Sequence, residues 1–171
     1  MSTNKTSILE AAILLSQMET VEIERVGATT GVKLALDSAR SNKHFQVFRG
    51  RSGADSPIAE VECRTCRADA GSKGTLIYLA LNENRAPGAA EIVAHLGKPK
   101  SVEVPLQKTG AAGSAIYVYQ IPGGELRFAV RTGAPERVLS IAIDRTSLAP
   151  RVRVRNRLAK WGKADLTPFT A

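Results

Sequence analysis

Cysteine, histidine and aromatic side chains are scarce in this sequence. Its 171 residues include two cysteines and two histidines, and aromatic residues make up 5% of the chain. Two cysteines cannot build the disulfide framework of a small secreted domain. No apolar run approaches the roughly 18 residues of a membrane span, and no export signal is recognisable. The sequence therefore predicts a globular cytoplasmic protein with no membrane contact.

Two short stretches have the pattern of helices. Ser7 and Glu10 have the spacing of a capping box, in which each side chain accepts a hydrogen bond from the other residue's backbone amide. They predict a helix over residues 7–18. Pro87 begins a second short helix, and Gly97 ends it because glycine readily adopts the backbone conformation that terminates helices.

Most of the remaining chain alternates apolar and polar residues, which is typical of strands. Residues 21–24 and 32–36 are expected to pair as a hairpin. Residues 75–81 are apolar throughout, which predicts a central strand covered on both faces. Residues 49–57 are rich in Gly, Ser and Pro and predict a loop. Further strands are predicted at residues 45–48, 58–64, 102–106, 115–121, 126–130 and 137–145.

These elements predict an α+β fold, an antiparallel sheet with two short helices packed on one face. Residues 1–144 form a compact body, with two helix-plus-meander halves at about residues 1–82 and 88–144. Each half is small for an independent domain, so the two halves are expected to pack together. Residues 145–171 follow as a basic C-terminal arm or edge strand.

The second half of the body resembles a known module. A helix ending in Leu-Gly-Lys-Pro at residues 96–99, an aromatic strand at 117–119, and strands at 126–130 and 138–143 carry the likeness. This layout resembles the BamE-type module, and the β-lactamase inhibitor proteins are similar, with two such modules in tandem. The resemblance covers about residues 88–145 and implies a non-catalytic fold that binds other proteins through its sheet. It carries over no specific functional residue.

Positive charge is concentrated at the end of the sequence. The net charge is +8, and residues 145–171 contribute +6 of it, from seven basic residues and one acidic residue. Residues 1–144 are therefore nearly neutral. A charge distribution of this kind is typical of an arm that contacts a polyanion. The side chains predicted to bind it are Arg151, Arg153, Arg155, Arg157, Lys160, Trp161 and Lys163.

The pattern within the arm fits more than one structure. Arginine at every second position of residues 151–157 predicts a strand with guanidinium groups about 6.8 Å apart, each able to grip phosphate oxygens. Trp161 lies between two lysines and is suited to stacking on a base. An edge strand whose arginines deter aggregation fits the same pattern, as does an arm that orders on an acidic protein partner.

Other candidate sites are weak. Cys63 and Cys66 form a lone C-x-x-C at the end of a predicted strand, without the second ligand pair of a zinc site or the helix N-terminus of a redox site. No metal or cofactor is expected. Arg49 and Arg51, in the predicted loop, are candidates for an anion contact. Glutamates at positions 60 and 62 alternate with apolar residues, which indicates a solvated strand face.

No set of residues supplies a nucleophile, a base and an orienting group, so the protein is not expected to be an enzyme. The sequence predicts a non-enzymatic binding or assembly protein whose basic arm contacts nucleic acid, another polyanion or an acidic protein. The alternative is a cytoplasmic inhibitor or immunity protein. It would bind a partner protein, or a second copy of itself, through an exposed sheet face that carries Tyr117, Tyr119 and Phe128.

Overall fold

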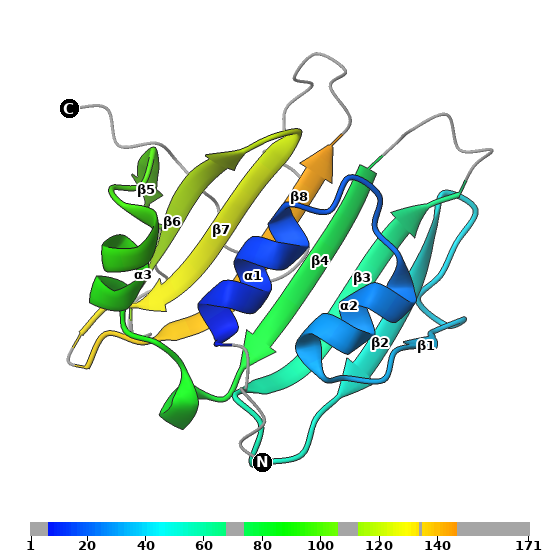
Figure 1. Cartoon of the computed structure of the whole chain (residues 1–171), viewed down its shortest axis with the longest axis horizontal. Coiled ribbons are helices and arrows are strands. Elements are labelled where there is room, and N and C mark those ends of the chain that lie inside the picture. The colour runs from blue at the N-terminus through cyan, green and yellow to red at the C-terminus, as the bar shows by residue number, and fades with distance from the viewer. Residues whose placement is uncertain (1–6, 68–73, 106–112, 134, 147–171) are drawn as a thin grey trace.

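The computed structural model of the chain describes residues 7–67, 74–105, 113–133 and 135–146. These residues form one eight-stranded antiparallel sheet with three short α-helices on one face (Figure 1). The predicted α+β class, an antiparallel sheet with helices, is therefore confirmed. Within these residues no helix is long and apolar enough to span a membrane.

The sheet consists of two four-stranded meanders that meet at its centre. Its strand order is β1-β2-β3-β4-β8-β7-β6-β5. The first meander contains β1 (Ala35–Leu36), β2 (Phe45–Arg51), β3 (Ile58–Cys66) and β4 (Gly74–Leu81). The second contains β5 (Ser101–Glu103), β6 (Ser114–Ile121), β7 (Gly124–Arg131) and β8 (Val138–Thr146). Because β4 pairs with β8, strands from both predicted halves belong to a single sheet.

One helix precedes each meander, and a further helix precedes both. Helix α2 (Ile23–Thr30) leads into β1, and α3 (Ala89–Leu96) leads into β5, after a short 3-10 turn, η2 (Glu83–Arg85). Helix α1 (Ile8–Ser16) lies over the central strands β4 and β8 (Figure 1). Its predicted capping box is present, with the Ser7 amide donating to Glu10 Oε2 at 2.7 Å and the Glu10 amide to Ser7 Oγ at 3.1 Å.

The predicted hairpin of residues 21–24 and 32–36 is wrong. Residues 23–30 form α2, and only Ala35–Leu36 is a strand in this part of the chain. Val26 and Thr30, four positions apart, are the buried residues of the helix, and the Thr30 hydroxyl donates to the Val26 carbonyl at 2.8 Å. Gly31 ends the helix at a φ of 69°, a conformation that glycine adopts without strain. The two alternating segments were too short to distinguish a strand from a helix.

The burial of β4 and the bounds of β2 and β8 also differ from the prediction. Strand β4 is central, but only its residues that face the helices, such as Ile77 and Leu79, are buried, whereas Tyr78 on the opposite face is partly exposed. Strand β2 extends to Arg51, which shortens the predicted loop to residues 52–57. Strand β8 extends to Thr146, so residue 145 belongs to the sheet and not to the arm.

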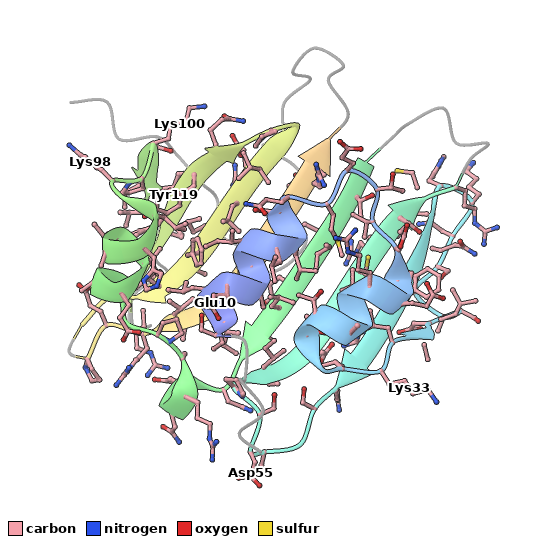
Figure 2. The ribbon with its side chains drawn as sticks, in the orientation of Figure 1. Glu10, Lys33, Asp55, Lys98, Lys100 and Tyr119 are labelled. Carbon is pink, nitrogen blue, oxygen red and sulfur yellow. The ribbon has the colours of Figure 1, made fainter. Side chains whose placement is uncertain are left out.

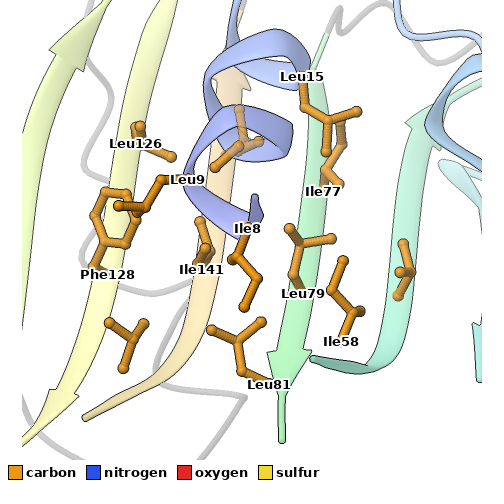
Figure 3. Packing of buried hydrophobic residues seen from close by; sticks show 14 of the residues in the cluster. Ile8, Leu9, Leu15, Ile58, Ile77, Leu79, Leu81, Leu126, Phe128 and Ile141 are labelled. Atoms are coloured by element: carbon orange, nitrogen blue, oxygen red, sulfur yellow. The ribbon is translucent and has the colours of Figure 1, made fainter. Parts of the chain in front are cut away.

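The hydrophobic core lies between the helices and the sheet. Apolar side chains of α1 pack on β4, β7 and β8 (Figure 3). Phe128 is fully buried, and its ring meets that of Tyr119 edge to face, with centroids 5.8 Å apart. The opposite face of the sheet, here called the open face, has no described helix over it (Figure 1).

Candidate anion-binding face

Charged side chains from β2 and β3 occupy one side of the open face. Val61 and Cys63 of β3 are buried in the core beneath the helices. Side chains alternate between the two faces of a strand, so Glu60, Glu62 and Arg64 lie on the open face. The strand register sets Arg49 opposite Glu62 and Arg51 opposite Glu60. Acidic and basic residues of the two strands therefore face each other in pairs.

Glu62 is the centre of this arrangement. Only 2% of its side chain is exposed, so the predicted solvated position is wrong for this residue. Its carboxylate lies 2.7 Å from Arg64 Nε, 3.4 Å from Arg49 Nε and 3.5 Å from Arg40 Nη1. A buried carboxylate is stable only when it is paired and hydrogen-bonded. Three guanidinium groups pair with Glu62, and those of Arg64 and Arg40 donate hydrogen bonds to it.

Two further carboxylates hold the neighbouring arginines. Glu60 pairs with Arg49 and lies 3.3 Å from Arg51 Nε. Asp37, which follows β1, lies 3.6 Å from Arg49 Nη1 and 3.8 Å from Arg40 Nε. The hydrogen bond to Glu60 raises the pKa of Arg49 above its usual value, and this guanidinium remains charged.

The cations lie further outward than the carboxylates. Arg40 and Arg51 are 52% and 78% exposed, whereas Asp37, Glu60 and Glu62 are 23%, 22% and 2% exposed. Two more exposed cations, at positions 43 and 67, flank the ends of β2 and β3, and neither has a side-chain partner among the described residues. We call the six cations the basic cluster: Arg40, Lys43, Arg49, Arg51, Arg64 and Arg67.

The structure changes the setting of the predicted anion contact at Arg49 and Arg51. Both residues lie in β2 rather than in a loop, and both are held by Glu60. An anion at this point would compete with that carboxylate. The other four members of the basic cluster, Arg40, Lys43, Arg64 and Arg67, were not predicted to belong to this site. The signal was present as alternate charges on both sides of the loop at residues 52–57, Arg-x-Arg before it and Glu-x-Glu-x-Arg after it.

The predicted protein-binding aromatics lie on the other face of the sheet. Phe128 is fully buried and Tyr119 is 8% exposed, which corrects the expectation that a partner can reach them. The Tyr119 hydroxyl donates to the Gly97 carbonyl at 3.0 Å, just after α3, beside which it lies (Figure 2). Tyr117 is partly buried against the same core. The prediction placed these residues on an exposed sheet face, but they lie on the face that the helices cover.

The predicted polyanion-binding residues of the arm lie outside the described residues. They are Arg151, Arg153, Arg155, Arg157, Lys160, Trp161 and Lys163. The described chain ends with β8, next to β4 at the centre of the sheet.

The two cysteines are on one strand but face in opposite directions. Cys63 is in the core, and Cys66, three residues further along β3, is on the open face. Three residues of strand span about 10 Å, beyond the roughly 7 Å limit for a disulfide. Burial, with a smaller contribution from Glu62, raises the pKa of Cys63 to about 12. A redox pair is therefore ruled out in this conformation. The described residues also contain no cluster of three or more His, Cys, Asp or Glu side chains that could hold a metal ion.

The described residues define a class of protein, a single-sheet α+β fold with helices on one face and a basic cluster on the other. Comparisons with protein-family models, with curated proteins and with solved structures gave no match for the chain.

Proposed function

We propose that the protein is a non-enzymatic binding or assembly protein of the cytoplasm whose basic C-terminal arm contacts nucleic acid or another polyanion. The observation that carries this proposal is the distribution of charge. Residues 147–171, which follow β8, contribute +5 of the net +8. Phosphate neutralisation by Lys and Arg is the main source of affinity for nucleic acid, and arginine binds phosphate in a bidentate manner.

The ion pairs of the body support a separate role for the arm. Arg127 lies 2.7 Å from Glu125 and 3.4 Å from Glu103. Arg85 pairs with Asp55 at 3.2 Å, and other body arginines are similarly paired. Because these cations already have carboxylate partners, the parts of the body around Arg85 and Arg127 offer a polyanion little unbalanced positive charge.

The proposal is tested by fluorescence anisotropy with labelled single- and double-stranded oligonucleotides at two salt concentrations. The full chain is compared with a variant in which Arg151, Arg153, Arg155 and Arg157 are changed to Gln. A control variant loses the same charge through Gln at Arg25, Arg85, Lys98 and Lys100. We expect salt-sensitive binding that the arm variant weakens and the control retains. Equal binding by the arm variant and the unchanged chain would contradict the proposal.

A protein partner on the open face is the second candidate function. It is favoured by the side of the sheet that no described helix covers, where Tyr78, Ala80 and Ala142 form a less charged strip at the centre. An inhibitor or immunity protein would use this strip and not the buried aromatic residues of the other face. A complex of this kind would slow amide exchange in β4 and β8 without any dependence on the arm.

A further inference from the structure

We propose that the basic cluster on β2 and β3 is a second anion-binding site, which holds phosphate groups of the same nucleic-acid strand that the arm binds. This inference rests on the proposed function and adds a contact surface on the body. Arg49, Arg51 and Arg64 of the cluster lie on the paired strands β2 and β3, and Arg40, Lys43 and Arg67 lie just outside the ends of these strands.

The first argument is net charge. The six cations of the cluster exceed its three carboxylates, which lie beneath the more exposed guanidinium groups. Those carboxylates also hold the arginines in place, so less side-chain entropy is lost when an anion binds. Lys43 and Arg67 contribute exposed charges without side-chain partners in the described residues.

The second argument is an aromatic ring within the cluster. Phe45 begins β2 and is partly exposed on the open face. The Arg64 guanidinium carbon lies 5.7 Å from the centroid of this ring, in a cation–π contact. Sites for single-stranded nucleic acid combine cations, which bind the phosphate backbone, with an aromatic ring on which a base stacks.

The third argument is position relative to the arm. The strand register aligns Thr146 with Gly74, at the start of β4, and Phe45 with Cys66, at the end of β3. The arm therefore begins at the same end of the sheet as Phe45. Three strand spacings separate β8 from β2, about 14 Å in all. A nucleic-acid strand held next to the end of β8 would therefore lie within reach of the cluster, and the second contact would form at a high effective concentration.

The described ion pairs at the opposite end of the sheet show no comparable excess of positive charge. Asp55 lies there (Figure 2) and pairs with Arg85, and Glu83 pairs with Arg131. Cations and carboxylates are balanced in these pairs. Lys98 and Lys100 lie beside β5, at the far edge of the sheet from β2 (Figure 2). These residues supply matched control substitutions.

The test measures the affinity of the full chain for a labelled single-stranded oligothymidylate of 20 nucleotides. The cluster variant carries Arg40→Gln, Lys43→Gln and Arg67→Gln. The control carries Arg85→Gln, Lys98→Gln and Lys100→Gln, which removes the same charge elsewhere. We expect the cluster variant to bind about tenfold more weakly than the control at low salt. The slope of log affinity against log salt should fall by about two, since each lost phosphate contact contributes about 0.7.

The outcomes separate this inference from the proposed function. If the arm variant binds weakly but the cluster variant matches the control, the second site is wrong and the arm proposal stands. If the unchanged full chain does not bind the oligonucleotide, the proposed function fails first. Because Arg40 contacts a buried carboxylate, thermal unfolding is measured alongside. The double variant Lys43→Gln/Arg67→Gln, which removes no described side-chain contact, repeats the test if the triple variant is unstable.

Discussion

Replacing Glu62 with Gln separates the stability of the body from its affinity for anions. The substitution keeps the size of the side chain and its ability to accept hydrogen bonds, but it removes the negative charge that three arginines share. Those arginines lie 2.7, 3.4 and 3.5 Å from the carboxylate. We expect a less stable protein that binds polyanions more tightly, two effects of opposite sign from one change.

The expected loss of stability follows from burial. Removing one member of a fully buried ion pair costs about 3–5 kcal/mol, because the remaining charge is left without a partner. Here the carboxylate is 2% exposed, but the arginines are 25%, 29% and 52% exposed and can be hydrated after the change. We therefore expect a decrease of about 2 kcal/mol in the free energy of unfolding, below the range for a fully buried pair. For a chain of this length, that lowers Tm by about 4–8 °C.

Urea unfolding followed by circular dichroism measures the first effect, and oligonucleotide anisotropy measures the second. Glu19→Gln is the control, since it removes the same charge from an exposed residue. A Glu62→Gln protein as stable as this control would refute the reasoning about the buried carboxylate. A stability loss without tighter binding would show that the freed guanidinium groups do not meet the anion.

Two further predictions concern the thiols and a glycine. In the native protein at pH 8, a thiol reagent should label Cys66 and leave Cys63 unmodified until unfolding, because burial raises the pKa of Cys63 to about 12. That pKa lies above the ordinary value of 9.0, so above pH 9 the thiol ionises in the unfolded chain but not in the folded one, and the free energy of unfolding should fall. Cys63→Ala should remove this contribution to the decline. Urea unfolding at several pH values measures both effects. Gly50→Ala should lower the free energy of unfolding by about 1–3 kcal/mol, because the new methyl would lie 2.7 Å from Val32 Cγ1. Gly53→Ala, which meets open space, is the control in urea unfolding, and equal stability of the two variants would contradict the prediction.

Local patterns were sufficient where the structure depends on near neighbours in the chain. The capping box of α1 joins residues three apart, and alternation together with the apolar run at residues 75–81 located β2 to β8. Charge segregation is likewise a property of the sequence alone. Helix α2 was missed because its only buried residues are Val26 and Thr30, four positions apart. Two buried positions are too few to indicate a helical period, and their burial became evident only once the helix was packed on the sheet.

Local patterns in the chain predicted the α+β class and most strands, and the order of charged residues shows that most of the net charge follows residue 144. The face of the sheet that the helices cover follows instead from how the helices pack on the strands. That arrangement buried Phe128 and Tyr119 and left the arginines of β2 and β3 on the opposite face, where Arg51 is exposed and Arg49 and Arg64 are partly exposed. Alternation divides side chains between two faces but does not identify the covered one. The register of strands far apart in sequence likewise brought the start of the arm to the end of the sheet where Phe45 lies.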